Sequence, residues 1–237
     1  MKLDLPAIGA APPRSSSRTG TLSPSVGLML ASALALATAI LGGFGAVGVW
    51  NARRAASGFP FRSLATSWDH AIPTVSGWVW VYVTYFPSLL LPFAFRRFRR
   101  EQSVFLRVCA GYVLQLVVCL PLFALPYRIW HRPTAAVGLS DWMLATIHRI
   151  DPGFNVFPSM HVSFVSYLAC VGTHLCGARV GAALWGFCAL IMASTLFTKQ
   201  HYLVDLPTGL LVGVAIFALV FWSGYSPFQK RTGPVSQ

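Results

Sequence analysis

The stretch Phe157–His161 reads FPSMH, and the stretch His201–Asp205, forty residues further along, reads HYLVD. Each stretch lies at the edge of a long apolar segment, so each places a histidine where lipid, protein and water meet. Asp205 follows His201 by four residues, a spacing that puts two side chains on one face of a helix. Because ionisable groups at membrane depth are costly, their usual explanation is a function. The two stretches therefore predict nucleophilic or acid–base chemistry inside a membrane protein.

The composition supports a membrane setting. Of the 237 residues, 55% are hydrophobic and only 10% are charged, and the mean hydropathy is +0.62. Soluble domains carry about 25% charged residues. Six apolar stretches are long enough, or nearly so, to cross a hydrocarbon core of about 30 Å as helices; they are 26–50, 72–95, 103–126, 160–176, 180–198 and 203–222. We therefore predict an all-α, polytopic membrane protein with six transmembrane helices and a helical-bundle catalytic core.

These stretches define one transmembrane domain over residues 26–223, whose motif-bearing part is 127–211. Residues 1–25 are rich in Pro, Ser and Arg, which predicts a disordered N-terminal tail. The same composition leaves open a signal peptide or an organelle transit peptide. Residues 224–237 are expected to form a C-terminal tail.

The net charge of +12 has two possible explanations: binding to nucleic acid, or positive charge concentrated in the cytoplasmic loops of a membrane protein. Four of the arginines form one cluster in Arg96–Arg100, directly after the second apolar stretch, which is typical of a cytoplasmic loop. The loops predicted on that side, with both tails, carry more Lys and Arg than the other loops. We therefore predict no nucleic-acid partner, cytoplasmic termini, and an integral protein of the cell (inner) membrane whose histidines face the non-cytoplasmic side.

A phosphate site is indicated around Pro158 and Ser159. This pair is typical of a helix start, with Ser159 as the cap, and the unpaired N–H groups of a helix N-terminus attract phosphate. Asn155, just upstream, would add an amide donor. Plain helix initiation at the membrane surface is the alternative. His161 places a titratable group one turn from this anion site.

His201 and Asp205 form the stronger pair. A carboxylate that accepts from one imidazole nitrogen leaves the other as a directed lone pair for attack; a structural hydrogen bond is the alternative. Phosphoryl oxygens need cations, and the outer loops supply Arg128, Arg132 and Lys199. Metal binding needs further ligands, and no His, Cys and acidic set appears at suitable spacing. We therefore predict no metal and no other cofactor.

The loop before these motifs contains a further expected element. Asp141–Ile147 predicts a short interfacial helix, capped by Ser140, that lies over the site. His131 and His148, in the same loop, are expected to be solvated or interfacial.

On these residues the chain resembles the type-2 phosphatidic acid phosphatase superfamily, whose members share a helical bundle and a phosphohistidine mechanism. That family carries K-x6-R-P, P-S-G-H and S-R-x5-H-x3-D. Here the second motif reads Pro158-Ser159-Met160-His161, and the third reads Ser194-Thr195, five residues, His201, three residues, Asp205. The first remains only as Arg132-Pro133, with Leu125 at the lysine position.

The departures remove two of the three phosphate-binding cations of the family, because Leu125 replaces Lys and Thr195 replaces Arg; Met160 replaces Gly. Lys199 and Arg128 are each one helical turn from a motif position and would restore the charge. The stretches 155–161 and 200–205 are similar to the inositol-phosphorylceramide synthase branch of sphingolipid metabolism, which transfers a phosphorylated head group to a lipid alcohol.

The resemblance implies catalytic residues His161, His201 and Asp205, and phosphate-binding residues Arg132, Ser159, Lys199, Arg128 and Asn155. The expected protein is a metal-independent phosphoric ester hydrolase or phosphotransferase that acts on a lipid phosphate or phosphodiester lipid. Transfer to a lipid alcohol, as in inositol-phosphorylceramide synthase, is one alternative. A non-catalytic lipid-binding membrane protein is an alternative of another class.

Overall fold

The computed structural model describes residues 22–130, 132 and 137–222. The predicted C-terminal tail, His131 and residues 1–21 of the N-terminal tail predicted over 1–25 lie outside these residues. Residues 22–25 are described, and Ser25 is the N-cap of α1. The described residues form helices without a strand, so the all-α prediction is confirmed. The helices are α1 (Val26–Ala56), α2 (Ser67–Ala71), η1 (Ser76–Trp78), α3 (Val79–Val83), α4 (Tyr85–Ser88), η2 (Leu91–Ala94), α5 (Arg96–Arg100), α6 (Gln102–Leu122), α7 (Leu139–Ile150), α8 (Met160–Cys176), α9 (Ala178–Phe197), α10 (Asp205–Phe217) and η3 (Ala218–Trp222).

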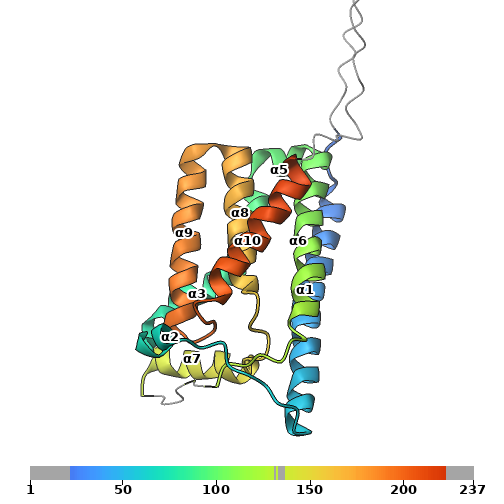
Figure 1. The fold of residues 1–237 in the computed structure, drawn as a ribbon. Coiled ribbons are helices and arrows are strands. Elements are labelled where there is room, and N and C mark those ends of the chain that lie inside the picture. Colours follow the sequence, from blue (N-terminus) through green and yellow to red (C-terminus); the bar gives the residue numbers. More distant parts are fainter. Residues whose placement is uncertain (1–21, 131, 133–136, 223–237) are drawn as a thin grey trace, which may run out of the picture.

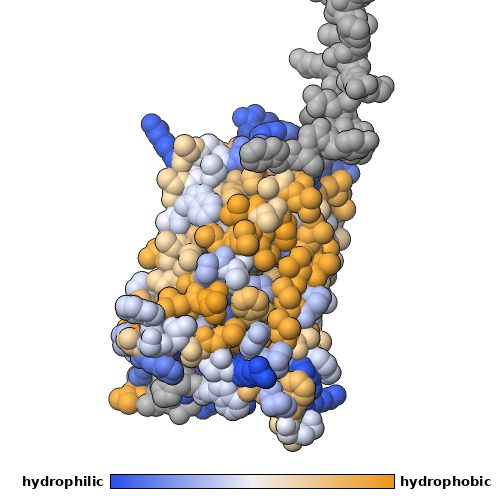
Figure 2. Space-filling view, in the orientation of Figure 1, coloured by the Kyte–Doolittle hydropathy of each residue, from blue (hydrophilic) through white to orange (hydrophobic). Residues whose placement is uncertain are grey.

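Among the described residues, α1, α6, α8, α9 and α10 run between two ends of a helical bundle (Figure 1). One end carries α5 with its arginines, and α7 crosses the opposite end. The first described residues lie at the α5 end, where Leu22 accepts a hydrogen bond from the backbone of Gln102. The last described helix, η3, ends there too (Figure 1). Figure 2 shows an apolar surface between two ends that are richer in hydrophilic residues, as expected of a bundle that spans a bilayer.

Three of the helices, α1, α6 and α9, are long and apolar enough to cross a membrane by length and composition. The apolar helices α8 and α10 are shorter. Helix α8 packs against α6, α9 and α10, and most of its residues are buried on every face. A helix that is apolar all round is a central helix, so α8 forms the middle of the bundle.

The second apolar stretch is not one continuous helix. Residues 72–95 contain the four short pieces η1, α3, α4 and η2. Pro87 lies in α4 and Pro92 in η2, and proline supplies no N–H to a helical ladder. Hydropathy predicts a crossing here but not its interruptions, because an average over many apolar residues hides the effect of two prolines on the backbone.

Helices α8 and α10 approach closely because two glycines of α10 have no side chain. A Cβ atom on Gly209 would lie 2.3 Å from the carbonyl oxygen of Ser159, and one on Gly213 would lie 2.3 Å from that of Ser163. This contact brings the start of α10 against the start of α8, so Asp205 lies near His161 in space.

Helix α7 lies across the end of the bundle, as expected, but it begins differently. Its N-cap is Gly138, and the Asp141 carboxylate accepts a hydrogen bond from the Gly138 N–H at 3.2 Å. The prediction that Ser140 caps this helix is wrong. Ser140 lies inside α7, and its hydroxyl accepts a hydrogen bond from the Trp80 indole at 2.9 Å. This bond ties α7 to α3.

Candidate active site

The two histidines of the sequence motifs face each other. Ser159 is the N-cap of α8, as predicted, and its hydroxyl accepts a hydrogen bond from the Val162 N–H at 3.3 Å. The cap directs the first turn of α8, with His161, toward the link between α9 and α10. His161 Nδ1 lies 3.0 Å from His201 Nε2, and both side chains are buried. Two elements that are forty residues apart in sequence therefore supply one pair of imidazoles.

Asp205 holds the other side of His201. Its Oδ2 atom lies 3.3 Å from His201 Nδ1 and accepts a hydrogen bond from the Tyr202 N–H at 2.8 Å. Asp205 is fully buried at the first position of α10. Since Nδ1 of His201 is held by the carboxylate, Nε2 is the nitrogen that faces His161. This is the orientation required of a nucleophilic imidazole.

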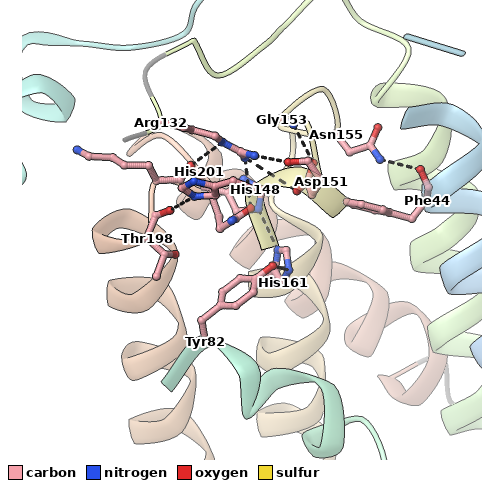
Figure 3. A network of polar contacts seen from close by, with 12 residues as sticks. Phe44, Tyr82, Arg132, His148, Asp151, Gly153, Asn155, His161, Thr198 and His201 are labelled. Carbon is pink, nitrogen blue, oxygen red and sulfur yellow. Dashed lines mark hydrogen bonds and ion pairs between the residues drawn. The ribbon is translucent and has the colours of Figure 1, made fainter. Parts of the chain in front are cut away.

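Tyr82 of α3 holds the other side of His161. Its hydroxyl lies 2.8 Å from His161 Nε2 and is buried (Figure 3). The ring of Tyr85 also packs on His161, with 4.6 Å between ring centroids. Neither tyrosine was predicted from the sequence, because nothing in the sequence distinguishes them from the other aromatic residues of their apolar stretch. Each histidine thus has its own partner on the nitrogen that faces away from the pair.

Arg132 lies on the loop side of the histidines (Figure 3). Its Nε donates to the Lys199 carbonyl at 3.1 Å, one Nη donates to the Asp151 carbonyl, and the other donates to the Gln200 side chain at 3.2 Å. The Asp151 carboxylate lies 4.0 Å from this second Nη. Burial lowers the pKa of Arg132, and Asp151 opposes that shift. Arginine remains protonated at neutral pH, so the group is a fixed positive charge beside His201.

Lys199 turns its ammonium group away from the histidine pair. Its Nζ donates to the carbonyls of Asp69 and Ile72, at 3.1 and 2.6 Å. Burial lowers the pKa of Lys199, and the Asp69 carboxylate opposes the shift. Asp69 also accepts a hydrogen bond from the Leu203 N–H at 2.7 Å. Helix α2 is therefore fixed to the link that carries His201, a contact that sequence reasoning missed.

The remaining predicted phosphate ligands lie at the rim of the site. The Arg128 guanidinium stacks on the rings of Trp130 and Phe154, 4.8 and 4.6 Å from their centroids. Asn155 donates from Nδ2 to the Phe44 carbonyl of α1 at 2.8 Å (Figure 3). Neither side chain contacts the histidines in this geometry.

His148 of α7 is buried, so the expectation of a solvated side chain is wrong. Its Nε2 atom lies 2.8 Å from the carbonyl oxygen of Thr198, in the link before His201. The bond fixes α7 over the site. A cavity of about 250 Å³ on this loop side is lined by Arg128, Arg132 and His148, among others.

No group of three or more His, Cys, Asp or Glu residues within 22–130, 132 and 137–222 is placed to hold a metal ion. The polar groups that the structure does bring together are two imidazoles, a carboxylate, a phenol and a guanidinium. This set suits metal-free transfer of a phosphoryl group.

The fold and site define an all-helical integral membrane protein with a buried histidine pair. The family model described as PAP2 superfamily matches residues 122–227, so this segment of the chain is similar to the domains of that family. The match contains both histidine motifs, and it confirms the resemblance that those motifs carry. Neither a curated protein nor a solved structure matches the chain. The superfamily contains phosphatases and phosphotransferases, so the match supports a lipid enzyme of that general type.

Proposed function

We propose that this protein is a membrane lipid phosphatase, or a phosphotransferase, that forms a phosphohistidine on His201. The observation that carries the proposal is the contact series from Asp205 through His201 to His161. Nδ1 of His161 and Nε2 of His201 face each other. The opposite nitrogens of the two rings contact Tyr82 and Asp205. A hydrogen bond with only a structural role would not require Tyr82 and Asp205 on the opposite nitrogens of the two rings.

In the first step the lone pair of His201 Nε2 forms a bond to phosphorus while the bond from phosphorus to the alcohol oxygen breaks. The alcohol oxygen keeps the electron pair and takes a proton from Nδ1 of His161. Asp205 accepts from Nδ1–H of His201 and stabilises the positive charge that forms on its ring. Tyr82 accepts from Nε2–H of His161, so Nδ1 is the nitrogen that exchanges protons.

In the second step His161 Nδ1 takes a proton from water, whose oxygen attacks phosphorus. The bond from His201 to phosphorus breaks, its electron pair returns to Nε2, and phosphate leaves. A lipid alcohol in place of water gives the transferase reaction of the inositol-phosphorylceramide synthase-like alternative. The cavity lined by Arg128 and Arg132 lies on the loop side of the site, where water is available as the acceptor.

The phosphoryl oxygens are assigned to Arg132 and to the start of α8. The first N–H groups of a helix have no partner within it, and they attract anions. Ser159 places this helix start beside His201, because its N–H donates to the Asp205 carbonyl at 3.2 Å. Lys199, Arg128 and Asn155 add positive potential and donors at the rim. The substrate lies at the end of the bundle opposite α5, which we assign to the non-cytoplasmic face.

Trapping of a labelled phosphoryl group by rapid quench tests the proposal. The wild type should carry acid-labile, base-stable label on His201, and His201→Ala should lose both label and turnover. Asp205→Asn should retain the fold and lose activity, because an amide stabilises the wrong imidazole tautomer. Label on His161, or the absence of label with every phosphorylated lipid in a panel, would refute the proposal and favour a non-catalytic lipid-binding protein. Adding alcohol acceptors to the panel separates hydrolase from transferase.

A further inference from the structure

Helix α2 contacts the link between α9 and α10 on both sides of His201. The Asp69 carboxylate accepts a hydrogen bond through Oδ1 from the Leu203 N–H at 2.7 Å, two residues after His201. Lys199, two residues before His201, donates from Nζ to the carbonyls of Asp69 and Ile72. The side chain of Asp69 is buried, so water competes little for its carboxylate. This short helix therefore holds the link on either side of the proposed nucleophile.

The second oxygen of the Asp69 carboxylate fixes the carboxylate itself. Oδ2 accepts hydrogen bonds from the Thr66 N–H at 2.8 Å and from the Thr66 hydroxyl at 2.7 Å. Thr66 is the N-cap of α2, and the two residues form a capping box. The capping box uses one oxygen of Asp69, whereas the other oxygen is directed at Leu203. One carboxylate thus joins the start of α2 to the link.

Two carboxylates fix the backbone directly after His201. The Tyr202 N–H donates to Asp205 at 2.8 Å, and the Leu203 N–H donates to Asp69 at 2.7 Å. Asp205 also holds Nδ1 of the His201 ring. Because the ring of His201 is carried by this backbone, the two carboxylates together set the direction in which its free nitrogen points.

The residue two positions before His201 lies in a backbone conformation that needs support. Lys199 has a φ of 53°, in the left-handed region, which a residue with a side chain adopts at a cost. Its carbonyl accepts a hydrogen bond from Arg132 Nε at 3.1 Å, while its Nζ is held by the two carbonyls of α2 and its C-cap. The ammonium group of Lys199 therefore supports the turn that leads into His201.

We infer that Asp69 is a positioning residue for the reaction at His201: its bond to Leu203 keeps His201 Nε2 aligned for attack on phosphorus. The inference rests on the proposed function and adds to it a residue that lies before the PAP2-matched residues 122–227. The attacking atom and the leaving oxygen lie roughly in line across the phosphorus, so the direction of the imidazole matters as much as its distance. Asp69 acts through the backbone of the link and exchanges no proton.

Rapid quench of the full chain in lipid nanodiscs tests the inference, with nitrophenyl phosphate and octyl phosphate as probes. Since a misplacement of about 1 Å costs about 100-fold in rate, Asp69→Ala should slow phosphoenzyme formation by about 10- to 100-fold with both probes. The substrate concentration that half-saturates the burst should not change. Loss of proton delivery would instead slow octyl phosphate far more than nitrophenyl phosphate, so equal losses identify a misaligned nucleophile.

Two further variants separate positioning from the stability of α2. Asp69→Asn retains an oxygen that accepts from the Leu203 N–H, and it should restore most of the rate that Asp69→Ala loses. Thr66→Ala is the matched control, because it removes the cap of α2 and leaves the bond from Asp69 to Leu203 in place. It should lower the thermal stability without slowing phosphoenzyme formation.

A second readout requires no turnover. It is the proton NMR signal of the His201 Nδ1–H, which faces Asp205, in protein with isotope-labelled histidine. The signal is assigned by its absence from His201→Ala. Asp69→Ala should shift or broaden it, whereas Asp69→Asn and Thr66→Ala should retain it.

An unchanged burst rate and an unchanged NMR signal in Asp69→Ala would overturn the inference. Equal losses of rate in Asp69→Ala and Thr66→Ala would overturn it too, because they would show that Asp69 only stabilises α2. If Asp69→Ala does not fold, Lys199→Met removes the other contact with α2 and should slow the burst with both probes; an unchanged burst rate in that variant would refute the inference. Absence of any phosphoenzyme in the wild type would refute the proposed function, and the NMR signal then decides alone whether Asp69 positions His201.

Discussion

Replacing Tyr82 by phenylalanine removes one hydroxyl and retains the ring that packs on His161. The hydroxyl lies 2.8 Å from His161 Nε2 in a fully buried site, so its loss leaves a ring nitrogen without its partner. Leaving a buried polar group unsatisfied costs about 1–3 kcal/mol, which corresponds to about a 5- to 150-fold loss of rate if the bond is needed in the transition state. We expect a loss of this size in kcat for alkyl phosphates.

The assay compares two leaving groups. A nitrophenolate leaves without a proton, so the first step, measured as the burst of released alcohol or nitrophenolate, should slow far less with nitrophenyl phosphate than with an alkyl phosphate in Tyr82→Phe. Tyr85→Phe is the matched control, because the Tyr85 hydroxyl has no hydrogen-bond partner among the described residues although its ring also packs on His161. In a His161→Ala background, Tyr82→Phe should cause no further loss. Equal losses for both leaving groups, or additive losses in the double variant, would refute the role assigned to Tyr82.

Three further predictions concern packing, metal dependence and topology. Gly209→Ala should lower the free energy of unfolding by about 1–3 kcal/mol, because its Cβ would lie 2.3 Å from a backbone oxygen. Gly186→Ala should raise it by up to about 1 kcal/mol, because the space beside Gly186 is open. Thermal unfolding of both variants checks the difference. Activity should persist in a metal chelator, and vanadate should inhibit; complete loss in chelator with rescue by one metal would contradict the proposed mechanism. On a cysteine-free background, Val137→Cys should react with an impermeant thiol reagent in intact cells, whereas Arg99→Cys should react only after permeabilisation. The reverse pattern would invert the assigned topology.

Hydropathy located the helices well where apolar residues run without interruption. The stretch 160–176 is α8 itself, and 180–198 differs from α9 by two residues or fewer at each end. The stretch 72–95 differs, because an apolar average does not detect the prolines that divide it. The four-residue spacing of His201 and Asp205 predicted the right contact, but the two residues do not share one helix. Helix α10 begins at Asp205, so His201 lies in the link before it, and the carboxylate reaches back to that link.

The partners of the site residues were not predictable from one sequence. Tyr82 contacts His161 across 79 positions, and Asp69 contacts Leu203 across 134. Such contacts depend on how the helices pack, and no local sequence pattern predicts them. Arg132 was found because a motif carries it, but its bond to the side chain of Gln200 follows only from the folded loops.

The distribution of these partners separates two parts of the proposed chemistry. His161, His201, Asp205 and Arg132 all lie within the PAP2-matched residues 122–227, whereas Tyr82 lies before them. Bond formation to phosphorus therefore depends on the matched domain. The orientation of the proton donor His161 depends in addition on Tyr82, which precedes that domain. Tyr82→Phe should therefore slow the departure of alcohols, while the first step with nitrophenyl phosphate, whose leaving group needs no proton, continues to report on His201.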